Sequence, residues 1–434
     1  MKNFTRRSFL RKSLLGAAGL TTYPFIKGFA SVPPSNQIRI GFIGLGRQGI
    51  GLMNGFHRHP AVKVVAGADV FGRKRDRFEM RVKEHQEEAG VTKEIEMSEN
   101  YQDMLERDDI DIIVIATPDH WHAIQTIDAC KSGKDIYLEK PLGFTIREGI
   151  EVVNSVREND VVLAMGSQQR SHHEFSYAAK LVREGRLGKL RKVNAWVGHP
   201  AVHYNLEEEP VPEDLNWDLW LGPNPYVHFN NELNPLISLD PVQNEEIWAG
   251  WRWYRETGGG SLTDWGAHNF DIAQWALDKD KSGPVEVIPA GHNGYEYIHF
   301  VYENGLVMAN APFTENENFG ARFEGEDAWI EVHRGQYRAS DEELELPEWE
   351  DDRPPELKDV APHLLNFLDC VKTRRDPIAP VEAGHRSGTI GILGNIATVL
   401  DRPLKWDPVN ERFAGDVEAN QHLHREYREG YCLV

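Results

Sequence analysis

A lysine, an aspartate and a histidine in two separate stretches of the sequence have the chemistry for proton transfer. Lys140 lies in "YLEKPLG" (residues 137–143), at the end of a short apolar run that predicts a β-strand. In "GGGSLTDWGAHNFDIAQW" (residues 258–275), Asp264 and His268 are four residues apart, so a helix places both on one face. A helix that presents this pair to a cleft is suited to acid–base catalysis, but such a pair is more often structural.

A glycine-rich turn indicates a phosphate-binding site. Residues 44–49, "GLGRQG", fit the pattern G-x-G-x-x-G, follow a predicted strand and open a predicted helix. Without Cβ atoms the backbone turns tightly, and a pyrophosphate can approach the helix N-terminus, where free N–H groups favour negative charge. The alternative is a glycine-rich turn that binds no ligand.

The identity of the nucleotide depends on the end of the next predicted strand. Asp69 follows the glycine turn by about 20 residues, where a carboxylate accepts hydrogen bonds from a ribose diol. A carboxylate there repels a 2′-phosphate, which favours NAD over NADP. Arg73 and Lys74 lie just beyond, and they could bind such a phosphate instead.

The elements that must position these residues alternate between strands and helices as far as about residue 169. Predicted strands cover residues 38–44, 62–70, 111–118, 135–141 and 161–169, and predicted helices lie near 74–89, 100–107, 119–132 and 145–159. Continuous Val/Ile runs separated by helices are typical of a parallel sheet covered on both faces. We therefore predict an N-terminal α/β domain with a doubly wound sheet of the Rossmann type.

The pattern changes after about residue 170. A helix at 174–184 leads to an irregular Pro- and Trp-rich stretch, and then to alternating strands that predict a mainly antiparallel sheet. Glu303-Asn304-Gly305 predicts a tight hairpin between two of these strands. Helices at 361–373 and 382–400 follow, and then a polar tail. The predicted parts are a leader at 1–30, a Rossmann domain at 36–165, a substrate and oligomerisation domain at 166–400 and a tail at 401–434.

In this order, the glycine turn, the Glu139-Lys140-Pro141 triplet and the segment from Gly258 to His268 resemble the Gfo/Idh/MocA family. That family is named after glucose–fructose oxidoreductase and inositol dehydrogenase, and the similarity covers roughly residues 36–400. It implies a Rossmann domain followed by an α/β domain whose open sheet supports the substrate site and often dimer contacts. We therefore expect a homo-oligomer.

The resemblance also implies roles for individual residues. His268 takes the hydroxyl proton of a sugar while its carbon passes hydride to the nicotinamide, Lys140 stabilises the charged oxygen, and Asp264 orients the pair. The residues expected to bind the cofactor are Gly44, Gly46, Arg47, Gln48, Gly49, Asp69, Thr117, Pro118, His122, Glu139 and Lys140. Thr117, Pro118 and His122 follow a strand end, but the same stretch could be a helix start capped by Asp119.

Three further residues are candidates for substrate contacts. Arg170 ends the next predicted strand in "GSQQR", where it could contact cofactor or substrate. Trp251 and Tyr254 could stack on a sugar ring, although packing in the protein interior explains them equally well.

Composition excludes several other functions. The net charge of −20 argues against nucleic acid and anionic membrane surfaces as partners, because both require basic patches. The histidine pairs do not form a known metal-ligand spacing, and no carboxylate cluster completes one, so we expect no metal. The three cysteines form no disulfide pattern.

The N-terminus indicates export. "TRRSFLRK" (residues 5–12) matches the twin-arginine pattern, and an apolar run at 14–26 and small residues near Ala30 follow. An ordinary secretory leader or a basic tail is the alternative. Twin-arginine export moves folded proteins, so we expect an exported, periplasmic protein that carries its cofactor tightly bound.

The predicted function is NAD-dependent hydride transfer at a secondary hydroxyl of a sugar, glycoside or polyol. The first alternative is a glycosidase, lyase or epimerase that oxidises a ring carbon transiently with no net redox change. The second is a sugar-binding protein that has lost catalysis, against which the intact Lys140, Asp264 and His268 speak.

Overall fold

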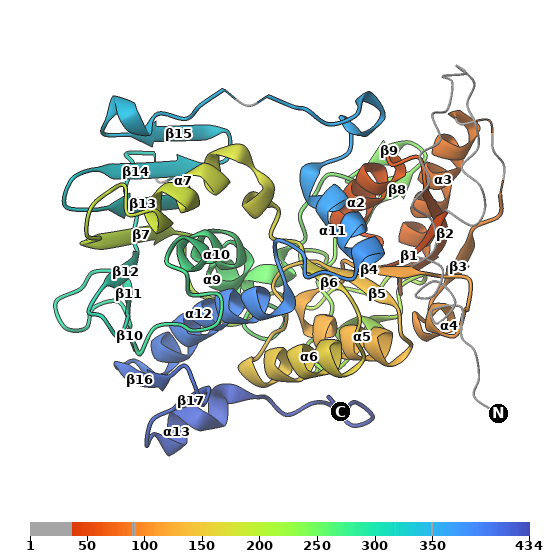
Figure 1. Cartoon of the computed structure of the whole chain (residues 1–434). Coiled ribbons are helices and arrows are strands. Elements are labelled where there is room, and N and C mark those ends of the chain that lie inside the picture. The colour runs from red at the N-terminus through yellow and green to blue at the C-terminus, as the bar shows by residue number, and fades with distance from the viewer. Residues whose placement is uncertain (1–36, 89, 91–92, 317, 349) are drawn as a thin grey trace, which may run out of the picture. The chain divides into compact units, whose positions relative to one another are not determined.

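The computed structural model describes residues 37–88, 90, 93–316, 318–348 and 350–434. The predicted leader at 1–30 lies outside these residues. Two sheets organise the described chain, one for each predicted domain (Figure 1).

The first sheet is parallel throughout and has the strand order β3-β2-β1-β4-β5-β6. Its strands are β1 (Ile38–Ile43), β2 (Val62–Ala68), β3 (Glu96–Ser98), β4 (Ile112–Ile115), β5 (Asp135–Leu138) and β6 (Leu163–Met165). Every residue of β4, with the sequence IIVI, is buried, as expected of a strand covered on both faces. This confirms the predicted Rossmann-type sheet, and adds β3, whose short polar sequence carries no strand signal.

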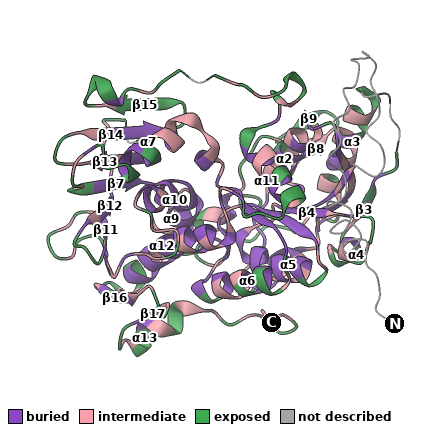
Figure 2. Cartoon of the chain, in the orientation of Figure 1, coloured by how far each residue is buried: buried purple, intermediate pink, exposed green. Residues whose placement is uncertain are grey.

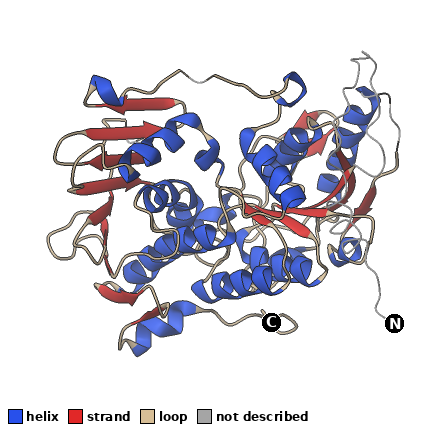
Figure 3. Cartoon of the chain, in the orientation of Figure 1, coloured by secondary structure: helices blue, strands red, loops and turns tan. Residues whose placement is uncertain are grey.

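Helices cover both faces of this sheet (Figure 3). They are α2 (Arg47–His57), α3 (Gly72–Glu88), α4 (Gln102–Leu105), α5 (Asp119–Lys131) and α6 (Ile146–Glu158). Helix α6 begins with a capping box in which Thr145 and Glu148 satisfy each other's backbone N–H groups. Helix α11 (Pro362–Thr373), assigned above to the second domain, instead packs beside α2, with the Phe367 and Phe56 rings 6.3 Å apart.

The second sheet has the order β15-β14-β13-β7-β12-β11-β10-β16-β17, and is antiparallel except where β12 pairs with β7. Its strands are β7 (Lys192–Trp196), β10 (Glu286–Ile288), β11 (Ile298–Val301), β12 (Val307–Asn310), β13 (Gly320–Glu324), β14 (Trp329–His333), β15 (Gln336–Ala339), β16 (Leu404–Asp407) and β17 (Arg412–Phe413). The predicted hairpin at Glu303-Asn304-Gly305 joins β11 and β12, and Gly305 takes the left-handed backbone conformation there with φ +81°.

One face of this sheet packs against four helices, α7 (His173–Arg183), α9 (Gly260–Asp264), α10 (Gly266–Ala276) and α12 (Val381–Leu400). Side chains alternate between the two faces of a strand, and this determines which face of the sheet is buried. In β7, Val193 and Ala195 are two positions apart, and both belong to the core. Figure 2 shows α10 and α12 as mostly buried helices beside the sheet. No helix in the described part of the chain is both long and apolar enough to cross a membrane.

The predicted polar tail is part of the folded structure. Leu404 and Trp406 are buried because β16 extends the second sheet, and the tail then returns to the first domain. There the hydroxyl of Tyr427 donates to Glu148, at 2.6 Å. The prediction was wrong because it weighed the polar residues and overlooked the spaced apolar ones.

The remaining short elements lie mainly in the irregular stretch and near the C-terminus. They are α8 (Trp217–Leu221), β8 (Ser238–Leu239), β9 (Val242–Gln243) and α13 (Val417–Asn420), and the 3₁₀ turns Gln168–Ser171, Gly250–Trp253, Glu342–Leu344, Pro355–Leu357 and Gln421–Leu423.

Candidate active site

Lys140 and Asp264 meet where the two domains face each other. Lys140 follows β5, and its Nζ donates to Oδ1 of Asp264 at 2.5 Å and to the Asp264 backbone oxygen at 3.1 Å. Arg252 is the second cation, with its Nε 3.4 Å from the same carboxylate oxygen. Burial alone raises the pKa of Asp264, but Lys140 and Arg252 outweigh it and hold that pKa below its ordinary value. Asp264 is therefore an anion that fixes the position of the Lys140 ammonium group.

The single helix predicted to carry both Asp264 and His268 is interrupted at Trp265, so that Asp264 ends α9 and His268 lies on α10. Burial lowers its pKa well below the ordinary value, and the nearby charges of Lys140 and Arg334 lower it further, so the ring is neutral at pH 7. Its Nδ1 is buried and has no hydrogen-bond partner among the described residues. The Trp265 ring packs edge-on against the imidazole, at 5.8 Å between centroids. A neutral imidazole with an unused nitrogen can accept a proton from a substrate hydroxyl.

Glu139 is a structural residue that links two parts of the site through hydrogen bonds. Its buried carboxylate accepts hydrogen bonds from Gln48 at 2.7 Å and from Gln168 at 2.9 Å. Burial raises its pKa, against the opposing effects of Lys140 and the two amides. Because Gln48 belongs to the glycine turn, Glu139 connects that turn to the strand end that carries Lys140.

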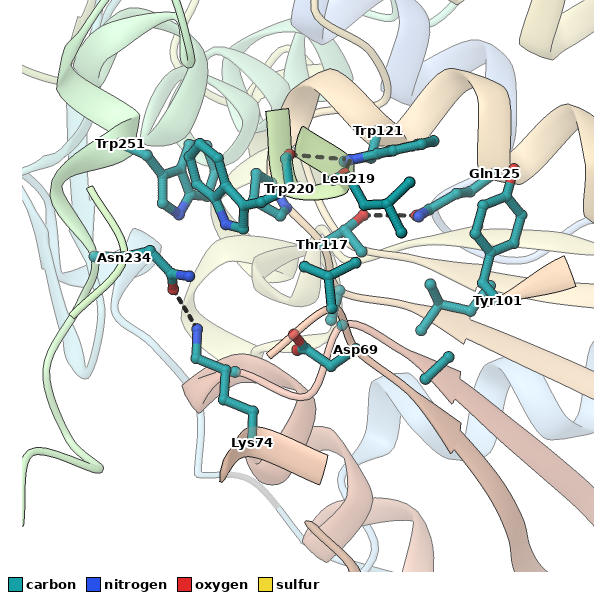
Figure 4. A pocket seen from close by; sticks show the side chains of 18 of the residues that line it. Asp69, Lys74, Tyr101, Thr117, Trp121, Gln125, Leu219, Trp220, Asn234 and Trp251 are labelled. Atoms are coloured by element: carbon teal, nitrogen blue, oxygen red, sulfur yellow. Dashed lines mark hydrogen bonds between the residues drawn. The ribbon is translucent and has the colours of Figure 1, made fainter. Parts of the chain in front are cut away.

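A cavity of about 730 Å³ lies at the carboxyl ends of the first sheet (Figure 4). The predicted cofactor residues among its lining are Gly44, Gly46, Arg47, Gln48, Asp69, Thr117 and Pro118. At Gly44, with φ +85°, a Cβ would come within 2.6 Å of the Ala116 backbone, so any larger residue is excluded. A Cβ on Gly46 would meet no protein atom within 4 Å, which leaves that part of the turn open toward a ligand.

Asp69 and Lys74 both face this cavity (Figure 4). Asp69 accepts hydrogen bonds from the Leu45 amide at 2.8 Å and the Phe71 amide at 3.0 Å, which fixes its carboxylate beside the glycine turn. The Lys74 ammonium group donates to Asn234 at 2.5 Å. Arg73, the other cation considered above, turns away to pair with Asp214.

Two segments that the sequence analysis did not connect with the cofactor cover the cavity. The Arg47 guanidinium lies 4.5 Å from the Trp248 ring centroid and pairs with Glu246 at 3.1 Å, both in the irregular stretch. From the other end of the chain, the Tyr431 ring packs edge-on against Trp121, with centroids 5.6 Å apart. The aromatic residues of the tail were the feature of the sequence that pointed to a packed tail, but their partners lie hundreds of positions away in the sequence.

His122, predicted to face the cofactor, is structural. Its ring nitrogens contact the backbone oxygens of Pro141 at 2.6 Å and Thr117 at 2.9 Å, and burial lowers its pKa to about 4. It therefore joins two adjacent strand ends. Asp119 is the first residue of α5 and does not cap it through its side chain.

Arg170 is not free to contact cofactor or substrate. Its buried guanidinium forms paired hydrogen bonds with Asp271 at 2.7 and 2.8 Å and with Asp280 at 2.7 and 2.8 Å. The prediction was wrong because residues on α10 and just beyond it approach this strand end only in the tertiary structure.

The two aromatic candidates differ. Trp251 lines the cofactor cavity and carries the Arg252 guanidinium 4.3 Å from its ring centroid. Tyr254 packs against Tyr204 and donates its hydroxyl to Glu232 at 2.7 Å, so it is an interior residue. Arg252 itself was missed, although it stands between the two aromatic residues that drew attention to this stretch.

The described residues contain no group of three or more His, Cys, Asp or Glu side chains placed to hold a metal ion. What they bring together is a nucleotide-sized cavity, an ammonium group held by a carboxylate, and a neutral buried imidazole. This set suits proton transfer coupled to hydride transfer.

Two protein-family models match the chain. The model described as "Oxidoreductase family, NAD-binding Rossmann fold" matches residues 38–167, and "Oxidoreductase family, C-terminal alpha/beta domain" matches residues 179–433. The chain therefore has an NAD-binding domain for a nicotinamide cofactor, and an α/β domain beyond it.

Among curated proteins, the chain is similar to a glycosyl hydrolase family 109 protein of Shewanella baltica strain OS195. The two are 30% identical over 262 residues, which is 56% of this chain and 55% of the relative. A relative in Shewanella pealeana, with the same family 109 description, is 29% identical over 259 residues, 55% of this chain and 54% of that protein. The chain thus matches about half the length of these curated relatives.

Solved structures share the fold. An aldose–aldose oxidoreductase of Caulobacter crescentus complexed with glycerol has a TM-score of 0.57 at 20% identity, covering 85% of this chain and 99% of that one. A levoglucosan dehydrogenase in complex with NADH and levoglucosan has a TM-score of 0.57 at 15% identity, with the same coverage. The WlbA dehydrogenase of Bordetella pertussis, in complex with NADH and UDP-GlcNAcA, has a TM-score of 0.56 at 18% identity, covering 86% and 99%.

Proposed function

The chain belongs to the Gfo/Idh/MocA family of oxidoreductases, and on this premise we propose that it oxidises a secondary hydroxyl of a sugar, glycoside or polyol. The observation that carries the proposal is the Lys140–Asp264 contact beside the neutral His268, at the strand ends that also form the nucleotide cavity.

The residues present fit a nicotinamide dinucleotide. Gly44 and Gly46 form the turn that a pyrophosphate would approach, and Asp69 faces the cavity, where its carboxylate would accept hydrogen bonds from a ribose diol. The Asp69 carboxylate is the reason to propose NAD rather than NADP. When bound, the cofactor supplies the hydride acceptor at the nicotinamide ring.

The protein's own groups carry out the proton chemistry. The unused ring nitrogen of His268 accepts the hydroxyl proton as the C–H hydride leaves the same carbon. Lys140, positioned by Asp264, donates a hydrogen bond to that oxygen and stabilises its developing negative charge. Arg252 keeps Asp264 ionised throughout, so Lys140 stays in place.

A second function is favoured by the enclosure of the cavity. The irregular stretch around Trp248 and the tail around Tyr431 both cover it, which supports slow release of the cofactor. A cofactor that stays bound suits a cycle that oxidises and then reduces the same molecule. Such an enzyme would cleave or epimerise a glycoside without net redox change, and the similarity to glycosyl hydrolase family 109 proteins supports this version.

We propose that residues 1–30 are a twin-arginine leader for export to the periplasm, with the folded protein carrying its cofactor across, on the strength of the twin-arginine pattern in the sequence. We further propose a homo-oligomer assembled on the second sheet, by analogy with the family. The proposed partners are a small sugar or glycoside and the export machinery, with no nucleic acid and no lasting membrane insertion.

Two measurements test these proposals together. Denaturing the purified protein and identifying the released nucleotide by mass spectrometry should yield NAD in stoichiometric amount, whereas an empty protein would contradict retention. Incubation with glycosides in deuterated water should then show either a ketosugar, or cleavage with deuterium exchange and no accumulation of NADH. Sugar that binds without chemical change or label exchange would support the binding-protein alternative.

A further inference from the structure

A second cavity, of about 480 Å³, lies at the end of β7. Its walls are aromatic, with the rings of Trp196, Trp253 and Phe319, and the side chains of His199 and Ser261 add polar atoms. It shares no lining residue with the cofactor cavity. It is therefore a separate cavity with an aromatic, partly polar lining.

This cavity adjoins the catalytic residues. Gly260 and Ser261 form the start of the short helix α9, which ends at Asp264, so the cavity lies about one helical turn before the catalytic carboxylate. The Phe319 ring lies 4.8 Å from Trp265, and Trp265 lies 5.8 Å from His268. A path of two ring contacts thus leads from the second cavity to the proposed general base.

Gly198 lines this cavity and adds no side chain that would narrow it. A Cβ on Gly198, which has φ +92°, would come within 3.1 Å of Ser261 and 3.3 Å of Phe319. The aromatic surface is also accessible, because Trp253 remains 39% exposed. A large aromatic side chain left this open beside an active site is suited to binding a ligand.

The polar groups complete a site with the chemistry for carbohydrate. His199 is exposed and packs its ring edge-on against Trp196, and neither its side chain nor that of Ser261 forms a hydrogen bond within the described part of the chain, which leaves both available to ligand hydroxyls. A sugar ring presents an apolar C–H face and a rim of hydroxyls. Aromatic walls and a few placed polar groups match both.

We propose that the second cavity binds the sugar on the far side of the glycosidic bond, so that the substrate is a glycoside of at least two sugar units. This inference rests on the proposed function, and it names the substrate class of the same active site. The ring that reacts lies at Lys140 and His268, and the neighbouring sugar lies against Trp253 and Phe319.

The test compares two pairs of probes on the holoenzyme. Methyl β-D-glucopyranoside is paired with cellobiose, and methyl α-D-galactopyranoside with melibiose, so that each pair shares its non-reducing sugar. In the pair that the enzyme accepts as substrates, Trp253→Ala should raise KM for the disaccharide about 10-fold. The same substitution should leave KM for the methyl glycoside unchanged. Tyr226→Ala, an exposed aromatic that is 68% accessible and lines neither cavity, is the matched control.

Binding is measured separately from turnover by tryptophan fluorescence, since two tryptophans line the cavity. If disaccharides bind no more tightly than methyl glycosides, or if Trp253→Ala weakens both equally, the subsite is overturned. Loss of the oligomer in Trp253→Ala, seen by sedimentation, would instead make this surface an interface between copies and would also overturn it. If binding behaves as expected but no probe reduces the cofactor, is cleaved or exchanges deuterium, the subsite stands and the proposed function fails.

Discussion

Lys140→Ala is the sharpest test of the catalytic arrangement. The substitution removes the donor that lies 2.5 Å from Asp264, in a pair whose side chains are 15% and 13% exposed. Breaking a fully buried ion pair costs about 3–5 kcal/mol. Here Arg252 still pairs with Asp264 and the site is partly exposed, so we expect a loss of only about 1–2 kcal/mol in the free energy of unfolding.

The effect on catalysis should be much larger than the effect on stability. Removing one donor that stabilises a developing oxyanion typically lowers kcat by about 10²–10³-fold. Lys140 also lowers the pKa of His268, so that pKa should rise in the variant. The base must be neutral to act, and therefore the acid limb of the pH–rate profile should move to higher pH.

The assay is a single-turnover measurement of nicotinamide reduction, with bound nucleotide quantified in the same sample. Lys281→Ala, which changes an exposed lysine, is the control and should behave as wild type. A Lys140→Ala rate within about tenfold of wild type, with cofactor still bound, would refute the assigned role. A normal rate after correction for lost cofactor would do the same.

Two further predictions concern pH and cofactor retention. Burial, and then the nearby charge of Asp264, raise the pKa of Asp119 to about 8. Between about pH 4 and about pH 8 the folded protein therefore keeps the Asp119 proton, and unfolding releases it. The contribution of protonated Asp119 to the free energy of unfolding falls as the pH rises from about 4 to about 8. The side chain in Asp119→Asn cannot ionise, so the Tm of the variant minus the Tm of wild type should increase as the pH rises through this range. Thermal melts measure this difference, and a difference that does not change with pH would contradict the raised pKa of Asp119. Arg428 anchors the tail by donating to Asp218 and to the Gly222 backbone, at 2.6 and 2.8 Å. Arg428→Ala should release nucleotide roughly 10-fold faster in a dilution experiment, and unchanged release would show that the tail does not retain the cofactor.

Much of the fold follows from local patterns. The buried run 112–115 and its neighbours predicted parallel strands, because Val/Ile runs between helices have few other ways to be buried. Gly44 was identifiable because a turn at that position leaves no room for a side chain. Local patterns did not predict strand β3, because its sequence is polar. They also did not predict that α11 packs with the first domain, because that packing does not depend on a local apolar pattern.

Individual partners were harder to predict than elements. The spacing of Asp264 and His268 predicted one helix, and the structure divides that segment into α9 and α10. Arg170 was predicted to belong to the site because it ends a strand near it. Its two carboxylate partners lie more than 100 positions away, so no local pattern indicated that its charge was already satisfied. For the same reason the sequence left two roles open for Tyr254, sugar stacking and interior packing. Its hydrogen bond to Glu232 shows that it is an interior residue.

Local patterns in the sequence were enough to predict the Rossmann turn, the two-part architecture and the residue types available for catalysis. These depend on backbone sterics and on the periodicity of apolar residues, which act over a few positions. Only the tertiary structure brought Lys140 to Asp264 across 124 positions, added Arg252 beside them, and closed the tail over the cofactor cavity. The physical reason is that periodicity specifies which face of an element is buried, whereas the packing of distant elements specifies which side chains that face meets.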